Sequence, residues 1–586
     1  MLRTTSRKRL LSVVALASSL ALVAGCGSDN GGSNGNGGGS EGGGGSEGGG
    51  SDEGYNGEIN IWAGSETPIT ANFNPFSPTV LHGALGPLHE PLMAYNKAGG
   101  GDPVPMLATA AEFSEDGTSM EITVREGVKW NDGEDFTAED VAFSFNFELS
   151  KPDYLVSAEA DGNTVTLTFD GPQYTKEAAI LQTLIIPEHI WANLGDEATE
   201  TEETDDGGEA LTFTNADNPV GTGPYMVDEV SESAYTMIPN ENYWQDGKPS
   251  LAKLRYLAVD DNQAAEDLLR QGKIDWAGMF IPDADAITED GKFAMINTPQ
   301  DPTVLYTCAN ADLGCTGAQT DVAVRQAINV ALDRGTIIEK AFVGHAGVSN
   351  PAFTAPERDD IWVADGVPTT NPDGPDAAAA RQILEDAGYE LNGDGIYEKD
   401  GQAVEMSLTS VDGWTDYNDA ATLMEEQLKE AGIKATASTI SWNEFADARD
   451  TGNFELIVGG VVGTQIADPF QIYDEWFAGY STTPVGEGLK PGTWNFSRYA
   501  NDEVDAAIKV AAGTVDQAEK QEAYATVQEH IVEDVPYIPL LMNATMTFMN
   551  VEDFTGWPTE DDLYMFPPSW GSISAGVIIG NLKVAN

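Results

Sequence analysis

The chain has 586 residues, of which 95 are acidic and 29 are basic, so its formal net charge at pH 7 is -66. A surface this acidic repels nucleic acid and anionic lipid headgroups, which argues against DNA, RNA and phosphorylated ligands as partners. The hydrophobic fraction of 41% and the aromatic fraction of 9% indicate a globular body, long enough for two or three packed domains.

The first 26 residues have the order of a lipoprotein export signal. Four basic residues precede an uncharged run over 10–24, which is too short to span a bilayer comfortably but suits the apolar core of a signal peptide. The stretch that closes the signal is Leu22-Val23-Ala24-Gly25-Cys26. We expect residues 1–25 to be removed and the thiol of Cys26 to take a lipid. An ordinary cleaved signal followed by a chance cysteine is the alternative, because Val23 stands where leucine is commoner.

A tether is expected after the signal. Beyond the cysteine, residues 26–54 are almost wholly Gly, Ser, Asn, Asp and Glu, a composition that cannot bury apolar surface and behaves as flexible coil. About 28 such residues have an r.m.s. span of about 30 Å. No later apolar run has the length of a membrane helix, so the lipid is the only expected anchor. The body is therefore expected outside the cytoplasm, held at the cell membrane.

The folded body is predicted to begin with a strand over Glu58–Trp62, followed by a loop over 71–78. Loops that leave the ends of strands carry ligand contacts in open α/β sheets. Phe73, Asn74 and Phe76 are therefore candidate ligand-binding residues.

The clearest local pattern lies in residues 119–149. Apolar and polar residues alternate over Met120–Val124 as they do in a strand, and Asp132-Gly133 predicts a turn. Thr137 is a predicted helix cap, and acidic residues in the first turn after it favour a helix start.

The stretch Arg125–Val141 reads R-E-G-V-K-W-N-D-G-E-D-F-T-A-E-D-V. It resembles a signature of family 5 of the extracellular solute-binding proteins, which feed ABC importers of oligopeptides, nickel and oligosaccharides. Further segments resemble that family in the same order, and together they span about residues 57–570. These segments are 186–190, 218–225, 242–249, 262–275 and 321–334.

Most residues of these motifs are interpreted as structural. Gly221 and Gly223 stand at the entry to a strand, where backbone shape matters. The segment 322–331 has the spacing of a packed helical face. Arg325 and Asp333 are interpreted as partners in a structural ion pair.

Two cysteines remain beyond the signal, Cys308 and Cys315. In an exported protein a pair this close predicts a small disulfide loop, not a metal or catalytic site. The histidines have no ligand spacing, so no metal and no cofactor is predicted. They are His82, His89, His189, His345 and His530.

Predicted helices and strands alternate over residues 376–534, which argues for sheets covered by helices. Asn392–Gly395 is interpreted as a hairpin turn, because it lacks the spaced acids and the closing glutamate of an EF-hand. The predicted helices are Asp376–Asp386, Asn418–Glu430, Asp502–Ala512 and Val515–Asp534, and the predicted strands are Glu405–Leu408, Ala435–Ile440 and Phe454–Val458.

The resemblance implies an α/β fold of the periplasmic-binding-protein type II class, a two-lobed clam with an extra inserted domain that buries ligand when its lobes close. Lobe I would combine 55–85, 212–300 and 535–586, residues 86–211 would form the inserted subdomain, and 301–534 would form lobe II. The implied partners are a small-molecule ligand and the permease subunits of an ABC importer with their ATPases. The protein itself is expected to be a monomer.

Two stretches in the expected lobe II have groups suited to a ligand. Trp414 follows a strand and is a candidate stacking residue, with a core tryptophan as the alternative. In peptide-binding relatives, an Asp four residues before the proline of the stretch Thr464–Pro469 pairs with the peptide's amino group. Here that position is Gln465, and an amide cannot neutralise a buried ammonium. Asp468 is a possible substitute, although it equally matches an acid that caps the turn.

Trp494 and Asn495 form a third candidate stretch. Indole and amide groups suit a sugar, since apolar sugar faces stack on rings and hydroxyls exchange hydrogen bonds with amides. The tail Gly556–Trp570 and the segment Asn72–Phe76 also resemble those of the family's β-oligosaccharide binders.

These features predict a substrate-binding lipoprotein of an ABC importer that captures an oligosaccharide or an oligopeptide, with the oligosaccharide slightly preferred and with no catalytic residue. A secreted glycosidase-like enzyme is one alternative, because 95 acids do not exclude a catalytic carboxylate pair by counting. A structural surface lipoprotein or a chaperone-like peptide binder is another.

Overall fold

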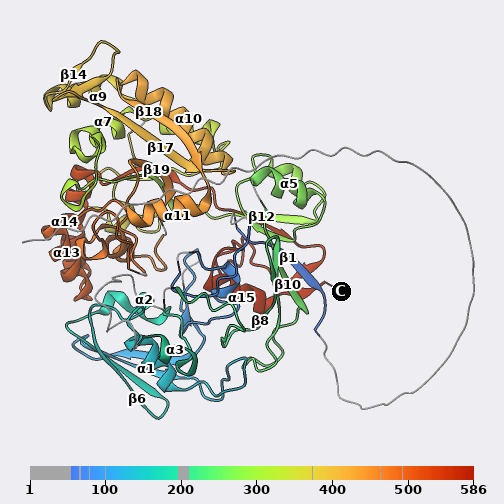
Figure 1. The fold of residues 1–586 in the computed structure, drawn as a ribbon. Coiled ribbons are helices and arrows are strands. Elements are labelled where there is room, and N and C mark those ends of the chain that lie inside the picture. Colours follow the sequence, from blue (N-terminus) through green and yellow to red (C-terminus); the bar gives the residue numbers. More distant parts are fainter. Residues whose placement is uncertain are drawn as a thin grey trace, which may run out of the picture. The chain divides into compact units, whose positions relative to one another are not determined.

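The computed structural model describes residues 55–64, 68–77, 79–98, 101–195, 210, 212–259, 261–372, 374–461, 463–490 and 492–585. Residues Gly54–Asn586 form one compact unit (Figure 1). The predicted signal peptide, the predicted lipid attachment at Cys26 and the predicted tether over 26–54 lie outside the described residues.

The largest sheet has seven strands, in the order β12 (Phe293–Asn297), β21 (Met546–Asn550), β11 (Trp276–Gly278), β1 (Glu58–Trp62), β10 (Lys253–Leu257), β9 (Ala234–Pro239) and β8 (Tyr225–Ser231). The predicted first strand is confirmed as β1, which runs parallel to both of its neighbours, β10 and β11. The other pairings are antiparallel. Tyr235 and Tyr256 face each other on β9 and β10, and their rings stack with centroids 4.5 Å apart.

A second sheet has five strands, in the order β18 (Lys434–Ile440), β17 (Glu405–Val411), β19 (Leu456–Gly460), β13 (Pro302–Thr307) and β20 (Tyr537–Met542). Strand β17 runs parallel to β18 and β19, whereas β13 runs antiparallel to β19 and β20. The three predicted strands of this region are confirmed, each within two or three residues at its ends.

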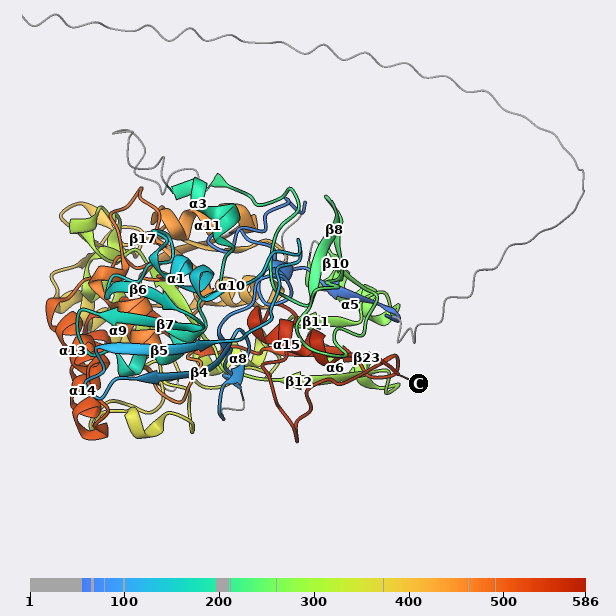
Figure 2. The same cartoon turned by 90° about the horizontal axis from the view of Figure 1, so that it is seen from below.

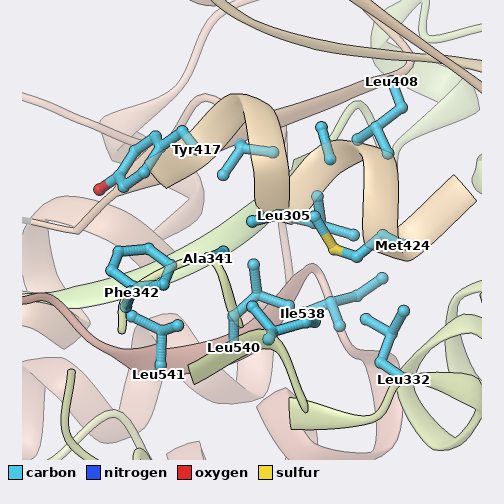
Figure 3. Packing of buried hydrophobic residues seen from close by; sticks show 14 of the residues in the cluster. Leu305, Leu332, Ala341, Phe342, Leu408, Tyr417, Met424, Ile538, Leu540 and Leu541 are labelled. Carbon is cyan, nitrogen blue, oxygen red and sulfur yellow. The ribbon is translucent and has the colours of Figure 1, made fainter. Parts of the chain in front are cut away.

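Helices cover both faces of the five-stranded sheet, because successive strand residues point to opposite faces. Leu305 of β13 packs in one apolar cluster with Met424 and Phe342 (Figure 3). Val304 and Tyr306, its neighbours in the chain, pack in another cluster with Phe445. The first cluster includes residues of α7 (Val322–Ala331), α8 (Arg334–Lys340), α9 (Ala377–Asp386) and α10 (Thr415–Glu430), and the second includes residues of α11 (Trp442–Thr451), α13 (Asp502–Ala512) and α14 (Gln517–Asp534).

A third sheet is antiparallel and has four strands, in the order β4 (Ala108–Phe113), β5 (Ser119–Val124), β7 (Thr164–Phe169) and β6 (Leu155–Asp161) (Figure 2). Burial alternates along β5, as the sequence pattern predicts. The helix predicted after Thr137 is confirmed as α1 (Ala138–Asn146). Its capping box is complete: the backbone N–H of Thr137 donates to Asp140 Oδ2 over 2.9 Å, and the Thr137 side chain accepts from the backbone N–H of Asp140.

Shorter elements connect these sheets. The Asn392–Gly395 turn joins two antiparallel strands, so the predicted hairpin is confirmed. The remaining helices are α2 (Glu177–Leu181), α3 (Glu188–Gly195), α5 (Asn262–Arg270), α6 (Ala284–Thr288), α12 (Phe470–Ile472) and α15 (Ile573–Asn581), and the remaining strands are β2 (Met93–Ala94), β3 (Val104–Pro105), β14 (Glu390–Leu391), β15 (Tyr397–Lys399), β16 (Gln402–Ala403), β22 (Phe554–Thr555) and β23 (Lys583–Val584). Single helical turns lie at His82–Ala84, Tyr174–Lys176, Ala311–Leu313, Ala318–Thr320, Asp360–Trp362, Tyr473–Phe477 and Gly479–Ser481.

Two expectations differ from the structure. Arg325 does not pair with Asp333: its guanidinium donates to the backbone carbonyls of Gln319 and Asp534, among others, and Asp333 caps α8 by accepting from the backbone N–H of Thr336. The buried Arg325 thus satisfies carbonyls at element ends, where no intrahelical donor is available. The expected last segment of lobe I starts at residue 535, yet β20 pairs with β13 in the five-stranded sheet, so the chain leaves that sheet only after Met542.

The two cysteines expected to pair, Cys308 and Cys315, form a disulfide with Cα atoms 5.4 Å apart. Of the helices in the described part of the chain, none combines the length and the apolar character that crossing a membrane requires.

Candidate ligand-binding site

A cavity of about 420 Å³ lies where strands of the two larger sheets end. Trp62 and Gly278 are the last residues of β1 and β11 in the seven-stranded sheet. Gly460 is the last residue of β19 in the five-stranded sheet, and Trp414 and Trp442 follow the ends of β17 and β18. All five residues line the cavity. Ligands of α/β proteins bind outside the carboxyl ends of parallel strands, and here two sets of such ends meet at one space.

The cavity wall is rich in aromatic rings. Trp414 is the centre of one group: its ring centroid lies 5.3 Å from that of Tyr417, 5.6 Å from that of Trp442 and 5.7 Å from that of Phe445. Rings held by neighbouring rings give flat, rigid faces on which a ligand can stack. The aromatic lining residues are Trp62, Phe280, Trp414, Tyr417, Trp442, Phe445 and Trp570.

One cation of the cavity wall lies over aromatic faces. The Arg449 guanidinium carbon is 5.4 Å from the Trp442 ring centroid and 5.0 Å from the Phe445 ring centroid. These three residues fall on one face of α11, because positions i, i+3 and i+7 align along a helix. Burial lowers the pKa of Arg449, although the guanidinium stays charged at neutral pH.

Asp416 is an acid of the cavity wall, on the first turn of α10. The residue is only 6% exposed, and burial raises the pKa of its carboxyl to about 7, while backbone N–H groups of the helix start lower it. Among the described residues, no Lys, Arg or His nitrogen lies within 4.0 Å of this carboxylate. The cavity therefore presents an acid whose charge no described cation balances.

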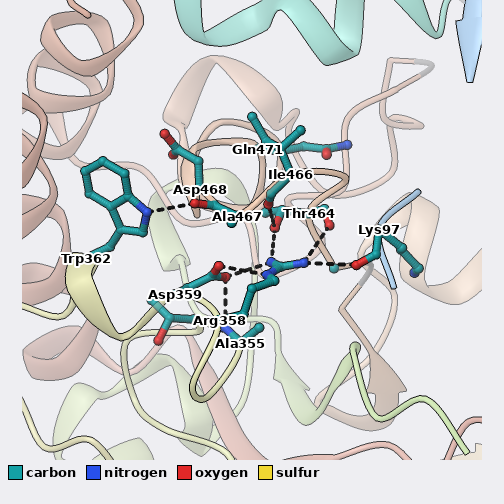
Figure 4. A network of polar contacts seen from close by, with 12 residues as sticks. Lys97, Ala355, Arg358, Asp359, Trp362, Thr464, Ile466, Ala467, Asp468 and Gln471 are labelled. Carbon is teal, nitrogen blue, oxygen red and sulfur yellow. Dashed lines mark hydrogen bonds and ion pairs between the residues drawn. The ribbon is translucent and has the colours of Figure 1, made fainter. Parts of the chain in front are cut away.

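The second acid of the wall, Asp301, is paired. Lys97 Nζ lies 2.8 Å from Asp301 Oδ1 and 4.1 Å from the ring centroid of Phe566. The backbone carbonyl of Lys97 accepts from Arg358, which also donates to Thr464 and to both carboxylate oxygens of Asp359 (Figure 4). Charge and hydrogen bonds in this network are satisfied within the protein.

Two further polar atoms lie at the cavity without a partner in the described part of the chain. They are His82 Nδ1 and Asn543 Oδ1, and both are buried. Burial lowers the pKa of His82 to about 4, so this imidazole is neutral at pH 7. In the ranges that the structure describes, no three or more His, Cys, Asp or Glu side chains gather into a group that could hold a metal ion.

Comparison with known proteins identifies the family. The model of the bacterial extracellular solute-binding proteins, family 5 (middle region), matches residues 102–483, which is more than half of the chain. The chain belongs to this family. Its members are extracellular solute-binding proteins of bacteria.

Two curated proteins are similar to this chain over most of its length. The oligopeptide-binding protein AppA of Bacillus subtilis is 27% identical over 486 residues, which make up 79% of this chain and 83% of the relative. Protein XP55 of Streptomyces lividans is 30% identical over 455 residues, which make up 74% of this chain and 75% of the relative.

Solved structures of the family have the same fold. A periplasmic oligopeptide-binding protein of an oligopeptide ABC transporter from Thermotoga maritima, solved with mannohexaose bound, is 25% identical and matches with a TM-score of 0.80 over 90% of this chain and 99% of that one. AppA of Bacillus subtilis, solved with a nonapeptide, matches with a TM-score of 0.73 at 22% identity over 91% of this chain and 99% of that one. The fold is the type II periplasmic-binding-protein fold with an inserted domain.

Of the eight ligand-binding candidates, Trp414 alone is among the residues that line the cavity of this solute-binding protein. Phe73 is fully buried and packs edge-on against Tyr235. The side-chain amide of Asn74 donates to the backbone carbonyls of Ala210 and Phe213, and Phe76 packs against Trp191. These three residues hold their loop in place.

Gln465 and Asp468 also lie away from the cavity lining. The backbone N–H of Gln465 donates to Gln471 Oε1 over 3.2 Å. Asp468 accepts hydrogen bonds from the Tyr524 hydroxyl and from Lys520 Nζ, at 2.5 Å and 3.1 Å, and from the backbone N–H that opens α12. Asp468 therefore has the capping role that the sequence left open for it.

The third candidate stretch contacts other parts of the protein. Asn495 is fully buried, and its side-chain amide donates to the backbone carbonyls of Ala478 and Tyr499. Trp494 stacks on Trp476 with ring centroids 6.3 Å apart. Neither Trp494 nor Asn495 lines the cavity.

Four residues of the cavity wall were not predicted from the sequence: Asp416, Trp442, Phe445 and Arg449. A signal for the last three was present, because Trp442, Phe445 and Arg449 have helical spacing directly after the predicted strand that ends at Ile440. Asp416 lies two residues after Trp414, on a helix that starts three residues earlier than predicted.

Proposed function

We propose that this protein captures an extracellular oligosaccharide in the aromatic cavity and delivers it to the permease of an ABC importer. The observation that carries the proposal is the set of indole rings on the cavity wall, from Trp62, Trp414, Trp442 and Trp570. Pyranose rings have apolar faces that stack on indoles, and their hydroxyls need polar partners at the rim.

Polar groups suited to hydroxyls accompany these rings. Asn262 and Asn543 have side-chain amides at the wall, and Arg449 has guanidinium donors. The cavity volume of about 420 Å³ is within the usual range for small-molecule sites, about 300–1,000 Å³. A similar protein from Thermotoga maritima was solved with a bound oligosaccharide, mannohexaose, which supports this ligand class.

We further propose the arrangement that would serve such capture. Lobe I combines 55–85, 212–300 and the segment after Met542, lobe II consists of 301–542, and 86–211 is an inserted subdomain. The protein is a monomer, and its two lobes close over the ligand. The lipid on Cys26 and the tether over 26–54 keep the body near the permease.

An oligopeptide is the second candidate ligand. The observation in its favour is that the cavity has one acid, Asp416, without a described cationic partner, and one cation, Arg449, held against aromatic rings. A peptide carries both an amino group and a carboxylate. Gln465 gives no evidence against a peptide, because its side chain does not line the cavity.

The test is a thermal-shift screen of the purified full chain against β-linked di- to hexasaccharides and against di- to pentapeptides. A ligand that binds the folded state raises the melting temperature by mass action. At a ligand concentration of a hundred times its Kd, the free energy of unfolding rises by about 2.7 kcal/mol. We expect stabilisation by saccharides. Stabilisation by peptides alone would contradict the sugar assignment, and turnover of a saccharide would contradict the binding function.

The aromatic wall gives a matched pair of variants. Trp442→Ala removes a ring from the cavity, and Trp494→Ala removes a half-buried ring outside it. We expect Trp442→Ala to weaken ligand binding by about two- to tenfold, since stacking on an aromatic ring contributes about 0.5–1.5 kcal/mol beyond area burial. Isothermal titration measures both variants, and an equal loss in Trp494→Ala would place the ligand elsewhere.

A further inference from the structure

We propose that Asp416 determines ligand selectivity by forming an ion pair with a primary ammonium group of the bound ligand. The inference rests on the proposed function, because it concerns the same cavity, and it names a charged group that the ligand carries. An ammonium can belong to an amino sugar or to the amino terminus of a peptide. The chemistry at Asp416 is the same for both sources.

The fold holds Asp416 firmly at the cavity wall. Strand β17 ends at Val411, and a short turn leads into α10, with Asp416 on its first turn. This turn is fixed against the start of α5: the backbone N–H of Asn262 donates to the carbonyl of Gly413 over 3.4 Å, and Asn262 Nδ2 lies 3.5 Å from Thr415 Oγ1. The carboxylate is thus presented to a ligand without a rearrangement of its helix.

The charge of Asp416 lacks compensation in the described protein. The backbone N–H groups of Asp416 and Tyr417 at the helix start lower the pKa of its carboxyl, and the charge of another acid, Asp419, raises it. A buried carboxylate without a cation is unfavourable, which is why burial raises its pKa to about 7. A ligand ammonium would supply the missing cation.

Other charged or titratable groups of the cavity wall have partners or are neutral. Lys97 and Asp301 pair with each other over 2.8 Å, and Arg449 lies over the rings of Trp442 and Phe445. His82 has a lowered pKa of about 4 and carries no charge at neutral pH. Of the acids among the described lining residues, Asp416 is therefore the one without a cationic partner within 4.0 Å.

The Asn543 amide oxygen of the wall favours a ligand with donors, because this atom can only accept. Asn543 Oδ1 and His82 Nδ1 are buried there without a hydrogen-bond partner in the described residues. An ammonium has three N–H donors, and aromatic faces attract cations. A neutral hydroxyl could also donate to Asn543 Oδ1, but it would supply no cation to Asp416.

The experiment uses four probes that form two pairs. Chitosan disaccharide carries free amines and N,N′-diacetylchitobiose does not; trialanine carries a free amino terminus and N-acetyl-trialanine does not. Isothermal titration of the full chain at pH 7 compares them in the wild type, in Asp416→Asn and in the control Asp419→Asn, which changes an exposed acid three residues further along α10.

We expect the wild type to bind at least one free-amine probe at least about tenfold more tightly than its acetylated partner, because hydrogen bonds to charged groups are the stronger ones. Asp416→Asn should abolish this preference, and Asp419→Asn should keep it.

Proton release gives a readout that does not depend on folding of a variant. At pH 6 the free Asp416 is mostly protonated, and it loses its proton when it pairs with an ammonium, so binding should release about one proton. Titrations in buffers of different ionisation enthalpy measure this number. At pH 7.5 the release should fall to a minor fraction of a proton.

The outcomes separate the two hypotheses. Equal affinity for amines and their acetylated partners, or a preference that survives in Asp416→Asn, would overturn the role of Asp416 and leave the binding function intact. Binding of trialanine without binding of any saccharide would overturn the sugar assignment and keep the role of Asp416. Failure of all four probes to bind would overturn both.

Discussion

Three acids whose pKa is raised by burial are expected to make the stability of this protein depend on pH near neutrality. Glu90 is fully buried, accepts from the Tyr243 hydroxyl over 3.0 Å and from Trp244 Nε1 over 3.1 Å, and has a pKa that burial raises to about 7. Burial also raises the pKa of Asp416 to about 7 and that of Glu475 to about 8. In each case the folded state binds the proton more tightly than the unfolded chain does.

The sign of the effect follows from linkage. A folded-state pKa above the unfolded value contributes stability that is complete below the unfolded pKa, near 4.5, and is lost as the pH rises through about 7. For Glu90 the loss is on the order of 3 kcal/mol. The wild type should therefore gain stability when the pH is lowered from 7.5 to 5, because Glu90 takes up a proton in the folded state. Glu90→Gln lacks this contribution, so its free energy of unfolding should fall further below that of the wild type at pH 5 than at pH 7.5.

Urea midpoints at pH 5 and pH 7.5 measure this difference. The matched control is Glu126→Gln, which changes an exposed acid. A difference between Glu90→Gln and the wild type that stays constant between the two pH values would contradict the prediction, because only a group that titrates in this window can make it vary.

The carboxylate of Asp140 joins the starts of two helices, α1 and α3. Its Oδ2 accepts from the backbone N–H of Thr137 over 2.9 Å, and its Oδ1 accepts from the backbone N–H of Glu188 over 3.0 Å, at the first residue of α3. Trp130 Nε1 also donates to Oδ2. One buried carboxylate thus satisfies donors from three segments of the chain.

Replacement of this acid should be costly. Asp140→Ala leaves one buried and two part-buried donors without this acceptor, at about 1–3 kcal/mol for a buried donor, so we expect a loss of about 3 kcal/mol. Thr137→Ala removes one cap and should cost about 1 kcal/mol. The control is Glu139→Ala, an exposed residue on the same turn, which should change the urea midpoint little. A loss in Asp140→Ala no larger than in Glu139→Ala would contradict the role of this carboxylate.

Secondary structure was predictable here because its signals are local. The alternation over Met120–Val124, the cap at Thr137 and the helical spacing over 502–512 each involve neighbours in the chain, and each element forms where it was expected. The disulfide could be inferred from the seven-residue separation of its cysteines. Helix starts were less certain: α10 begins at Thr415, within the turn that carries the site.

The site was predictable only in part, because it depends on which strand ends meet. Trp62, Trp442 and Trp570 come to one cavity from the ends of separate segments, and no local pattern relates them. Gln465 was chosen by its place in a motif, but its side chain does not line the cavity. Asn74 and Asn495 have the residue type of a ligand contact, yet the side-chain amide of each donates to a backbone carbonyl of a neighbouring segment. Residue type alone does not separate a ligand amide from a loop amide.

The excess of acids acts on the whole molecule. With 95 acidic and 29 basic residues, the folded chain concentrates negative charge in a compact volume, and unfolding relieves the repulsion. Salt screens that repulsion, since the Debye length falls from about 10 Å at 0.1 M to about 3 Å at 1 M. We therefore expect the melting temperature to rise by several degrees between 0.1 M and 1 M sodium chloride. Surface ion pairs such as Lys490–Asp153 weaken over the same range, but an exposed pair contributes less than about 1 kcal/mol.

The comparison that isolates charge is a second titration with sucrose, which favours the folded state by exclusion from the protein surface and does not screen charge. A variant in which exposed acids of α14, such as Glu519 and Glu522, are replaced by glutamine should show a smaller salt response and an unchanged response to sucrose. A melting temperature that is flat or falls with sodium chloride would mean that favourable ion pairs outweigh the repulsion of the acidic surface. In that case the net charge would not be what limits the stability of the fold.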